Sequence, residues 1–162
     1  KTFYLDPLGI DRRDCWVTDV VKVFLFKDGH REKYDRLGVT PPRGYARERF
    51  EEIALKSIPW IERELDVAEP KLVITLGAEI AGLLRGVSSP PKRNALLGPV
   101  PTPLRFGNLE VPCVHLAHPG IVMRRGDGVR NPWPRLHAEE HVPKLREWLV
   151  SHGLVRPAHV SP

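Results

Sequence analysis

The segment best suited to do chemistry is Val111–Arg125, in which a histidine directly follows a short apolar run. The run ends at Ala117 and is bounded by Pro112 and Pro119, as expected of a buried strand stopped by a residue that cannot donate a ladder hydrogen bond. His118 is therefore predicted at the carboxyl end of a strand, where open α/β sheets bind ligands. Two interpretations stay open, namely a group that contacts a ligand and a cap whose ring bonds to backbone.

Basic residues accompany this histidine. The net charge of the chain is +5, which favours a polyanionic partner. A basic surface is predicted from Lys22, Lys92, Arg93, Arg124 and Arg125. Each of these is either a phosphate contact, which sets affinity rather than sequence preference, or an ordinary solvated charge.

Composition limits the class of protein. With 162 residues and 41% hydrophobic content, the chain is predicted to form a single domain over residues 1–162. Cys15 and Cys113 lie in apolar, strand-like runs and are interpreted as reduced core residues. Two thiols are too few for an iron–sulfur cluster or an all-cysteine zinc site, so we expect no metal and no cofactor. Without a membrane-length apolar stretch or a signal-like start, the chain is expected to be soluble and cytoplasmic, with no membrane contact. We also expect a monomer.

The amino-terminal half of the chain gives two predicted elements around a long loop. Cys15–Val21 is predicted as a strand and Lys22–Arg43 as a charged, turn-rich loop. Apolar residues at helical spacing predict an amphipathic helix over Tyr45–Leu65, which Pro59 should kink or split.

The second half alternates strands with helices. The predicted elements are a strand Pro70–Leu76, a helix Gly77–Leu84 stopped at Gly86, a proline-rich loop Ser88–Pro103, a turn at Phe106–Leu109, a strand Val111–Ala117 and a helix from about Arg135 to His152 that ends at Gly153. The glycine turn at Gly77 and Ala78 exposes helix N-terminal amides, a possible seat for phosphate, although Gly77 could equally serve helix–strand packing.

This alternation predicts an α/β fold, a three-layer αβα sandwich with a short, mostly parallel central sheet. Three strands are few for this much helix, and residue 1 falls in what looks like the helix before the second strand. We therefore expect that a first strand and its amino-terminal segment are missing from this sequence.

Three segments in this order resemble the uracil-DNA glycosylase superfamily, especially its bacterial and archaeal branches. They are Val17–Lys22, Glu69–Ala78, and His118–Arg124 with Arg130–Trp133, and the resemblance runs through most of the chain. It implies a monofunctional DNA glycosylase that flips a damaged or modified pyrimidine base and hydrolyses its N-glycosidic bond, with DNA as partner.

The resemblance also implies roles for single residues. In that family, the residue matching His118 bonds the base oxygen on which negative charge develops. The turn matching Pro119 and Gly120 follows the DNA backbone, and residues matching Val122 and Met123 press into the duplex where the base leaves.

Two departures concern missing motifs. The family's water-orienting carboxylate and base-stacking aromatic residue belong after the first strand, and neither is present, in agreement with the missing segment. Members with an iron–sulfur cluster would have cysteines about where Val23 and Ala54 stand, so the chain resembles the branch without a cluster. An alternative function stays open, a catalytically silent, glycosylase-like module that only binds nucleic acid.

A third departure concerns the base. The family's base-reading asparagine is matched by Asp19. An ionised carboxylate only accepts hydrogen bonds, so it would be repelled by O4 of uracil but could accept from the exocyclic amine of cytosine. A protonated Asp19 could serve uracil, although Lys22 nearby would oppose the raised pKa that this requires. Alternatively, Asp19 pairs with Lys22 or a backbone amide and touches no base.

Overall fold

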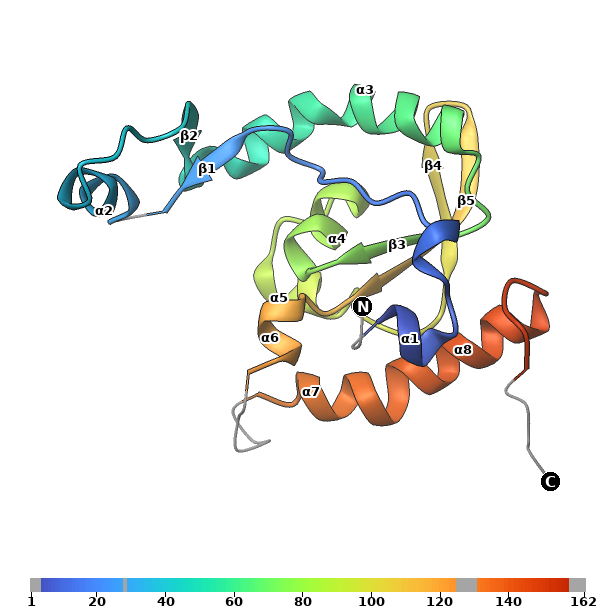
Figure 1. The fold of residues 1–162 in the computed structure, drawn as a ribbon. Helices are drawn as coiled ribbons and strands as arrows, with labels where there is room; N and C mark the ends of the chain where they lie inside the picture. Colours follow the sequence, from blue (N-terminus) through green and yellow to red (C-terminus); the bar gives the residue numbers. More distant parts are fainter. Residues whose placement is uncertain (1–3, 28, 125–130, 158–162) are drawn as a thin grey trace. The chain divides into compact units, whose positions relative to one another are not determined.

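The structure, a computed structural model, describes residues 4–27, 29–124 and 131–157. The chain divides into two compact units, unit 1 (Lys1–Trp16 with Ala68–Pro162) and unit 2 (Val17–Val67). Both mix helices with strands, which confirms the predicted α/β class (Figure 1). The single domain over residues 1–162 stays a prediction. In the described ranges, no helix combines the length and apolar character that crossing a membrane requires.

The sheet of unit 1 has three strands in the order β3-β5-β4. Their bounds are β3 (Val73–Leu76), β4 (Thr102–Phe106) and β5 (Leu109–Leu116). β3 runs parallel to β5, with Val73 opposite Cys113 and Leu76 opposite Leu116. β4 pairs antiparallel with β5 through the predicted turn near Gly107, but the strand itself was not predicted. Pro101 and Pro103 made the segment look like a loop, because proline occurs in strands chiefly at a sheet edge, which is where β4 lies.

The helices of unit 1 follow the sequence prediction at two places, after β3 and at the carboxyl end. They are α1 (Leu5–Leu8), a 3₁₀ turn (Arg12–Asp14), α4 (Ala78–Arg85), α5 (Pro90–Asn94), α6 (Pro119–Val122), α7 (Trp133–Leu136), a π-helical turn (His137–His141) and α8 (Val142–Ser151). α4 ends at Gly86 in the left-handed region, as predicted. The predicted proline-rich loop contains α5, so it is shorter than expected.

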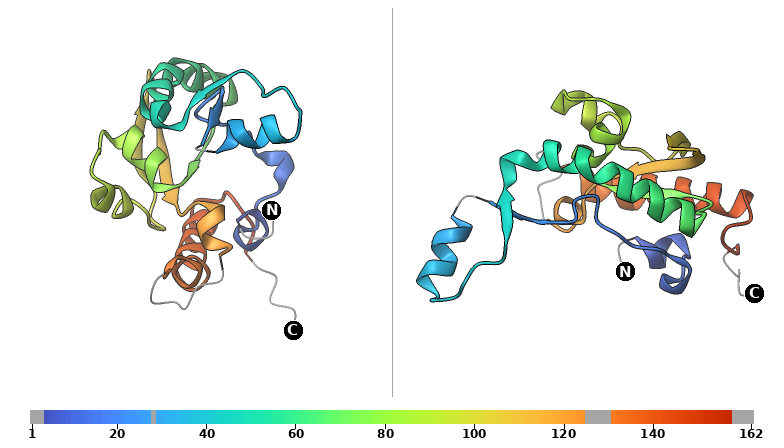
Figure 2. Two further views of the ribbon diagram at one scale, coloured as in Figure 1. Left: turned by 90° about the vertical axis from the view of Figure 1, so that its left-hand side faces the viewer. Right: turned by 90° about the horizontal axis from the view of Figure 1, so that it is seen from above.

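The helices of unit 1 lie on both faces of its sheet (Figures 1 and 2). On one face, Val114 and Leu116 of β5 pack in the core cluster with Leu145 of α8 and with α1. On the other face, His115 of β5 contacts Arg85 of α4 at 3.1 Å. The predicted αβα layering is therefore confirmed in unit 1, around a small sheet.

Unit 2 differs from the prediction. It contains a parallel pair, β1 (Phe24–Phe26) with β2 (Gly44–Ala46), connected through α2 (His30–Arg36). The predicted strand Cys15–Val21 is wrong, because residues 15–21 are neither strand nor helix and Val17 is 63% exposed. An apolar run becomes a strand only where a neighbouring strand can pair with it. The predicted loop Lys22–Arg43 instead contains β1 and α2.

The long helix of unit 2, α3, spans Phe50–Ala68 after a 3₁₀ turn at Arg47–Arg49. It passes through Pro59 without being split. A proline at this position removes the hydrogen bond to the carbonyl of Leu55, a residue that is 56% exposed, so water can replace the lost donor.

Candidate functional site

His118 lies directly after β5 and caps the amino end of α6. Its backbone is extended, and its carbonyl accepts from the amides of Ile121 at 2.8 Å and Val122 at 3.2 Å. Its Nδ1 atom accepts from the Gly120 amide at 3.0 Å, although the side chain is exposed. His118 therefore has the hydrogen bond that the cap interpretation expects. The cap uses Nδ1 and does not involve Nε2, so a ligand contact through Nε2 stays open.

This cap decides which nitrogen of His118 carries the proton. Because Nδ1 accepts from Gly120, we infer that the ring is neutral with its proton on Nε2. A neutral imidazole fixed in this tautomer is a single directed hydrogen-bond donor. It can stabilise negative charge that develops on an oxygen placed beside it.

Gly77 lies against His118, so the structure brings these two predicted site residues together. The Gly77 amide donates to the carbonyl of Leu116 at 2.8 Å, and a Cβ built on Gly77 would lie 3.5 Å from the Cβ of His118. Its φ of +110° favours glycine. Because its amide is used by β5, Gly77 does not offer that amide to a phosphate, and a phosphate seat would start at Ala78, the first residue of α4.

The segment after His118 separates two residues that were predicted to act alike. Val122 is 6% exposed and belongs to the core cluster, so little of its side chain is open to a ligand, and its contact with the duplex stays a prediction. Met123 is 59% exposed and Ile121 38% exposed. Arg124 is exposed as well, whereas Arg125 lies outside the described residues.

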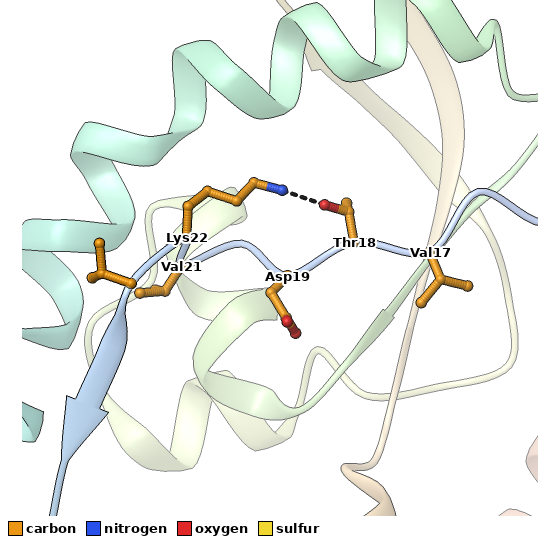
Figure 3. A pocket seen from close by; sticks show the side chains of 6 residues that line it. Val17, Thr18, Asp19, Val21 and Lys22 are labelled. Atoms are coloured by element: carbon orange, nitrogen blue, oxygen red, sulfur yellow. Dashed lines mark hydrogen bonds between the residues drawn. The ribbon is translucent and has the colours of Figure 1, made fainter. Parts of the chain in front are cut away.

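Asp19 and Lys22 lie in unit 2, on the irregular segment before β1. Residues Val17, Thr18, Asp19, Val21, Lys22 and Val23 line an open pocket of about 530 Å³ (Figure 3). Lys22 Nζ pairs with Glu64 at 2.8 Å and donates to the Thr18 hydroxyl. The positive charge of Lys22 is therefore largely neutralised by Glu64, within unit 2. Convergence of these residues with His118 at one sheet edge stays a prediction.

The Asp19 carboxylate points away from Lys22 and Thr18 (Figure 3). It is exposed, and within the described ranges it makes no hydrogen bond or ion pair. The alternative in which Asp19 pairs with Lys22 is therefore not what the structure contains.

A chain of polar side chains, buried at Thr75 and His115 and half-buried at Arg85, connects the three strands of the unit 1 sheet. Nε of Arg85 donates to Nε2 of His115 at 3.1 Å, and Nδ1 of His115 lies 2.6 Å from the Thr75 hydroxyl. The same guanidinium donates to the Pro103 carbonyl at 2.7 Å and to the Thr102 hydroxyl at 2.6 Å. Burial, and secondarily the Arg85 charge, lowers the pKa of His115 to about 4. His115 is therefore held neutral.

Three contributions to this end of the sheet were not predicted. They are the Thr75–His115–Arg85 chain, a hydrogen bond from Tyr4 to the carbonyl of Ala117 at 2.6 Å, and one from Asn131 to the carbonyl of Ile121 at 3.0 Å. Asn131 lies in a segment that carried the resemblance. Tyr4 and His115 gave no signal, because their partners lie 113 and 40 residues away.

No cluster of three metal-ligating side chains occurs among the residues that the structure describes. No curated protein sequence matches the chain significantly. The family model of the uracil DNA glycosylase superfamily, whose members are DNA glycosylases, matches residues 2–142. With the strand-end histidine, the glycine turn behind it and a match over most of the sequence, the chain belongs to the uracil DNA glycosylase superfamily.

Proposed function

We propose that this chain removes a damaged or modified pyrimidine from DNA by flipping the base and hydrolysing its N-glycosidic bond. The observation that carries the proposal is the capped His118 ring. Its Nδ1 is held by Gly120 at 3.0 Å, which leaves Nε2–H as an exposed, oriented donor. Membership of a family of DNA glycosylases supports assigning this donor to the departing base.

In the proposed reaction, the bond between C1′ and the base nitrogen breaks, and its electron pair leaves with the base. Negative charge then develops on a base oxygen, where the Nε2–H of His118 stabilises it. Water adds its oxygen to C1′, and the proton it releases balances the proton that the base anion takes up. One such preorganised donor is typically worth about 2.7–4 kcal/mol of barrier.

Base flipping costs a few kcal/mol, which contacts with the rest of the DNA must offset. We assign the wedge to Met123, with Val122 as its buried anchor. The turn at Pro119 and Gly120 follows the DNA backbone, and the exposed Arg124 binds phosphate.

The remaining proposed DNA contacts come from the start of α4 and from two further basic residues. Ala78 offers an amide at the start of α4, and Gly77 supports the turn. A phosphate contact of Arg125, which lies outside the described residues, is part of the proposal. Lys22 contributes weakly, since Glu64 competes for its charge.

Asp19 is the proposed reader of the base. Its exposed carboxylate, directed away from Lys22, supports this role (Figure 3). A carboxylate accepts from an exocyclic amine and repels a carbonyl oxygen, so we expect cytosine or a modified cytosine to be preferred to uracil.

The test is single-turnover base release from oligonucleotides that carry uracil, thymine, cytosine or a modified cytosine. Abasic sites are detected by alkaline strand cleavage, and DNA affinity is measured on the same oligonucleotides. Release from at least one of them supports the enzyme. Tight binding of all four without release would instead identify a silent nucleic-acid-binding module.

We propose that the protein acts as a monomer inside the cell. Sedimentation of the free protein and of its DNA complex would check the monomeric state.

A further inference from the structure

The carbonyl of Ala117 is the last backbone acceptor before His118, and it lies beyond the strand ladder. The preceding carbonyl, of Leu116, is taken by the Gly77 amide at 2.8 Å, after which the chain turns into α4. Ala117 is only 1% exposed, so water cannot easily satisfy its carbonyl. A buried carbonyl without a donor is destabilising. Here the donor is a side chain, the Tyr4 hydroxyl, at 2.6 Å.

Tyr4 is itself held in place. It is 9% exposed, and its ring lies 4.5 Å from the ring of His137, tilted by 53°. Burial raises the pKa of the Tyr4 hydroxyl to about 12, so the group remains a donor across the pH range of an activity assay. A phenylalanine would fill the same volume but could not donate.

The Ala117 carbonyl and the His118 amide share one peptide plane. Fixing the carbonyl therefore fixes the direction from which the His118 Cα leaves the strand. The hydrogen bond between His118 Nδ1 and the Gly120 amide acts only after that Cα has been placed.

We propose that Tyr4 is a positioning residue for His118, acting through its hydrogen bond to the Ala117 carbonyl. This inference rests on the proposed function for its effect on rate. Its effect on the geometry of His118 does not depend on any activity.

The test compares Tyr4→Phe with Tyr34→Phe, a matched control that removes the same hydroxyl group from α2 of unit 2. Three quantities are measured on the full chain: amide hydrogen exchange at Gly120, the ¹⁵N signals of the His118 ring, and single-turnover base release with DNA affinity. Tyr4→Phe should speed exchange at Gly120 about tenfold, the size expected for loss of one hydrogen bond. Base release should fall about 10- to 100-fold, because a small misplacement of a reacting group is enough to slow a reaction by this factor. DNA affinity should stay within about twofold of that of the unmodified protein. Tyr34→Phe should leave all three unchanged.

The exchange and ring signals decide the inference even if the protein releases no base from any substrate, a result that would contradict only the proposed function. Unchanged Gly120 exchange and unchanged His118 signals in a folded Tyr4→Phe variant would overturn it. If Tyr4→Phe does not fold, replacement of Tyr4 by 4-aminophenylalanine retains a donor and should restore folding, Gly120 protection and rate together. Restored folding with an unprotected Gly120 amide would reduce Tyr4 to a structural residue.

Discussion

The two predicted contacts to a base, His118 in unit 1 and Asp19 in unit 2, are held in opposite ways. His118 follows a buried strand, and its ring, its carbonyl and the peptide before it are all hydrogen-bonded. Asp19 lies on an irregular segment, with an exposed carboxylate that no described residue binds. One side chain is oriented before any ligand arrives, and the other is not.

This difference matches two kinds of task. A group that stabilises developing charge must already be oriented, since reorganisation during the reaction would consume the benefit. A group that discriminates between bases needs only to be satisfied by one and not by the other. We therefore expect changes at His118 to alter rate, and changes at Asp19 to alter preference.

The largest effect is expected at His118. His118→Ala should reduce single-turnover base release by about 10²–10³, because it removes a preorganised donor, while DNA affinity stays nearly intact. His152→Ala is the matched control, since this exposed histidine stacks on Trp148 at the end of α8. If both variants released base at the same rate, His118 would have no part in the reaction and the contrast with Asp19 would disappear.

The support behind His118 should be sensitive to acid. His115 has its pKa lowered to about 4 from 6.5, so between these values the unfolded chain binds a proton that the folded chain does not. Stability should therefore fall as pH decreases through this window, by about 1–2 kcal/mol after allowance for screening. Denaturant unfolding from pH 7 to pH 4.5 measures it. His115→Gln cannot titrate, and an equally steep decline in that variant would assign the acid sensitivity to other groups.

A smaller loss of rate is expected when the cap is crowded. A Cβ on Gly120 would lie 3.1 Å from Nδ1 of His118, so Gly120→Ala must shift the ring by a few tenths of an ångström. Base release should fall about tenfold. Stability should not fall, since alanine is the better helix former. Gly98→Ala is the control, because a Cβ there meets nothing within 4 Å. Equal rates in both variants would mean that the orientation of the ring is not limiting.

At Asp19 we expect a change of preference without a change of stability. Asp19→Asn should shift preference toward uracil, because an amide both donates and accepts. The free energy of unfolding should change by less than about 0.5 kcal/mol, as is usual for an exposed residue. The ratio of release from uracil to release from cytosine or its derivative is the measurement, and an unaltered ratio would remove Asp19 from base reading.

The smallest effect separates two cations. Arg124→Gln should flatten the slope of log K against log[salt] by about one unit if the arginine binds a phosphate. Lys22→Gln should flatten it less, because Glu64 already holds that ammonium group at 2.8 Å. Equal changes in slope would mean that the Lys22 pair opens when DNA binds.

Sequence patterns predicted the part of the fold that local interactions determine. The strand before His118 and the glycine-bounded helix α4 appear close to their predicted bounds. The predicted carboxyl-terminal helix is also helical throughout, but it consists of α7, a π-helical turn and α8 in place of one α-helix. The prediction of a strand at Cys15–Val21 failed because a strand needs a partner strand, and none of the strands in the described residues pairs with this segment. The local sequence does not reveal this. β4 was missed because Pro103 within it and Pro101 just before it are typical of loops as well as of sheet edges.

The candidate site divides in the same way. His118 and Gly77 could be predicted as site residues, since each comes shortly after the last residue of a predicted strand. The burial of Val122 beside the exposed Met123 could not, because which of two neighbouring apolar residues faces the core depends on the path of the following chain. The ion pair between Lys22 and Glu64 joins segments far apart in the sequence, so no local pattern could predict it.

The polar chain through His115 has a consequence for how the sheet is specified. Thr75 and His115 are opposite each other across the parallel pair β3 and β5. If β5 slipped by one residue, His115 would move to the opposite face, among the apolar side chains of α8, and Arg85 would lose its imidazole partner. Such misaligned pairings would bury an unsatisfied polar group, a cost that an all-apolar strand would not impose. His115 therefore helps to specify a single register of β5 against β3, independently of its contribution to stability.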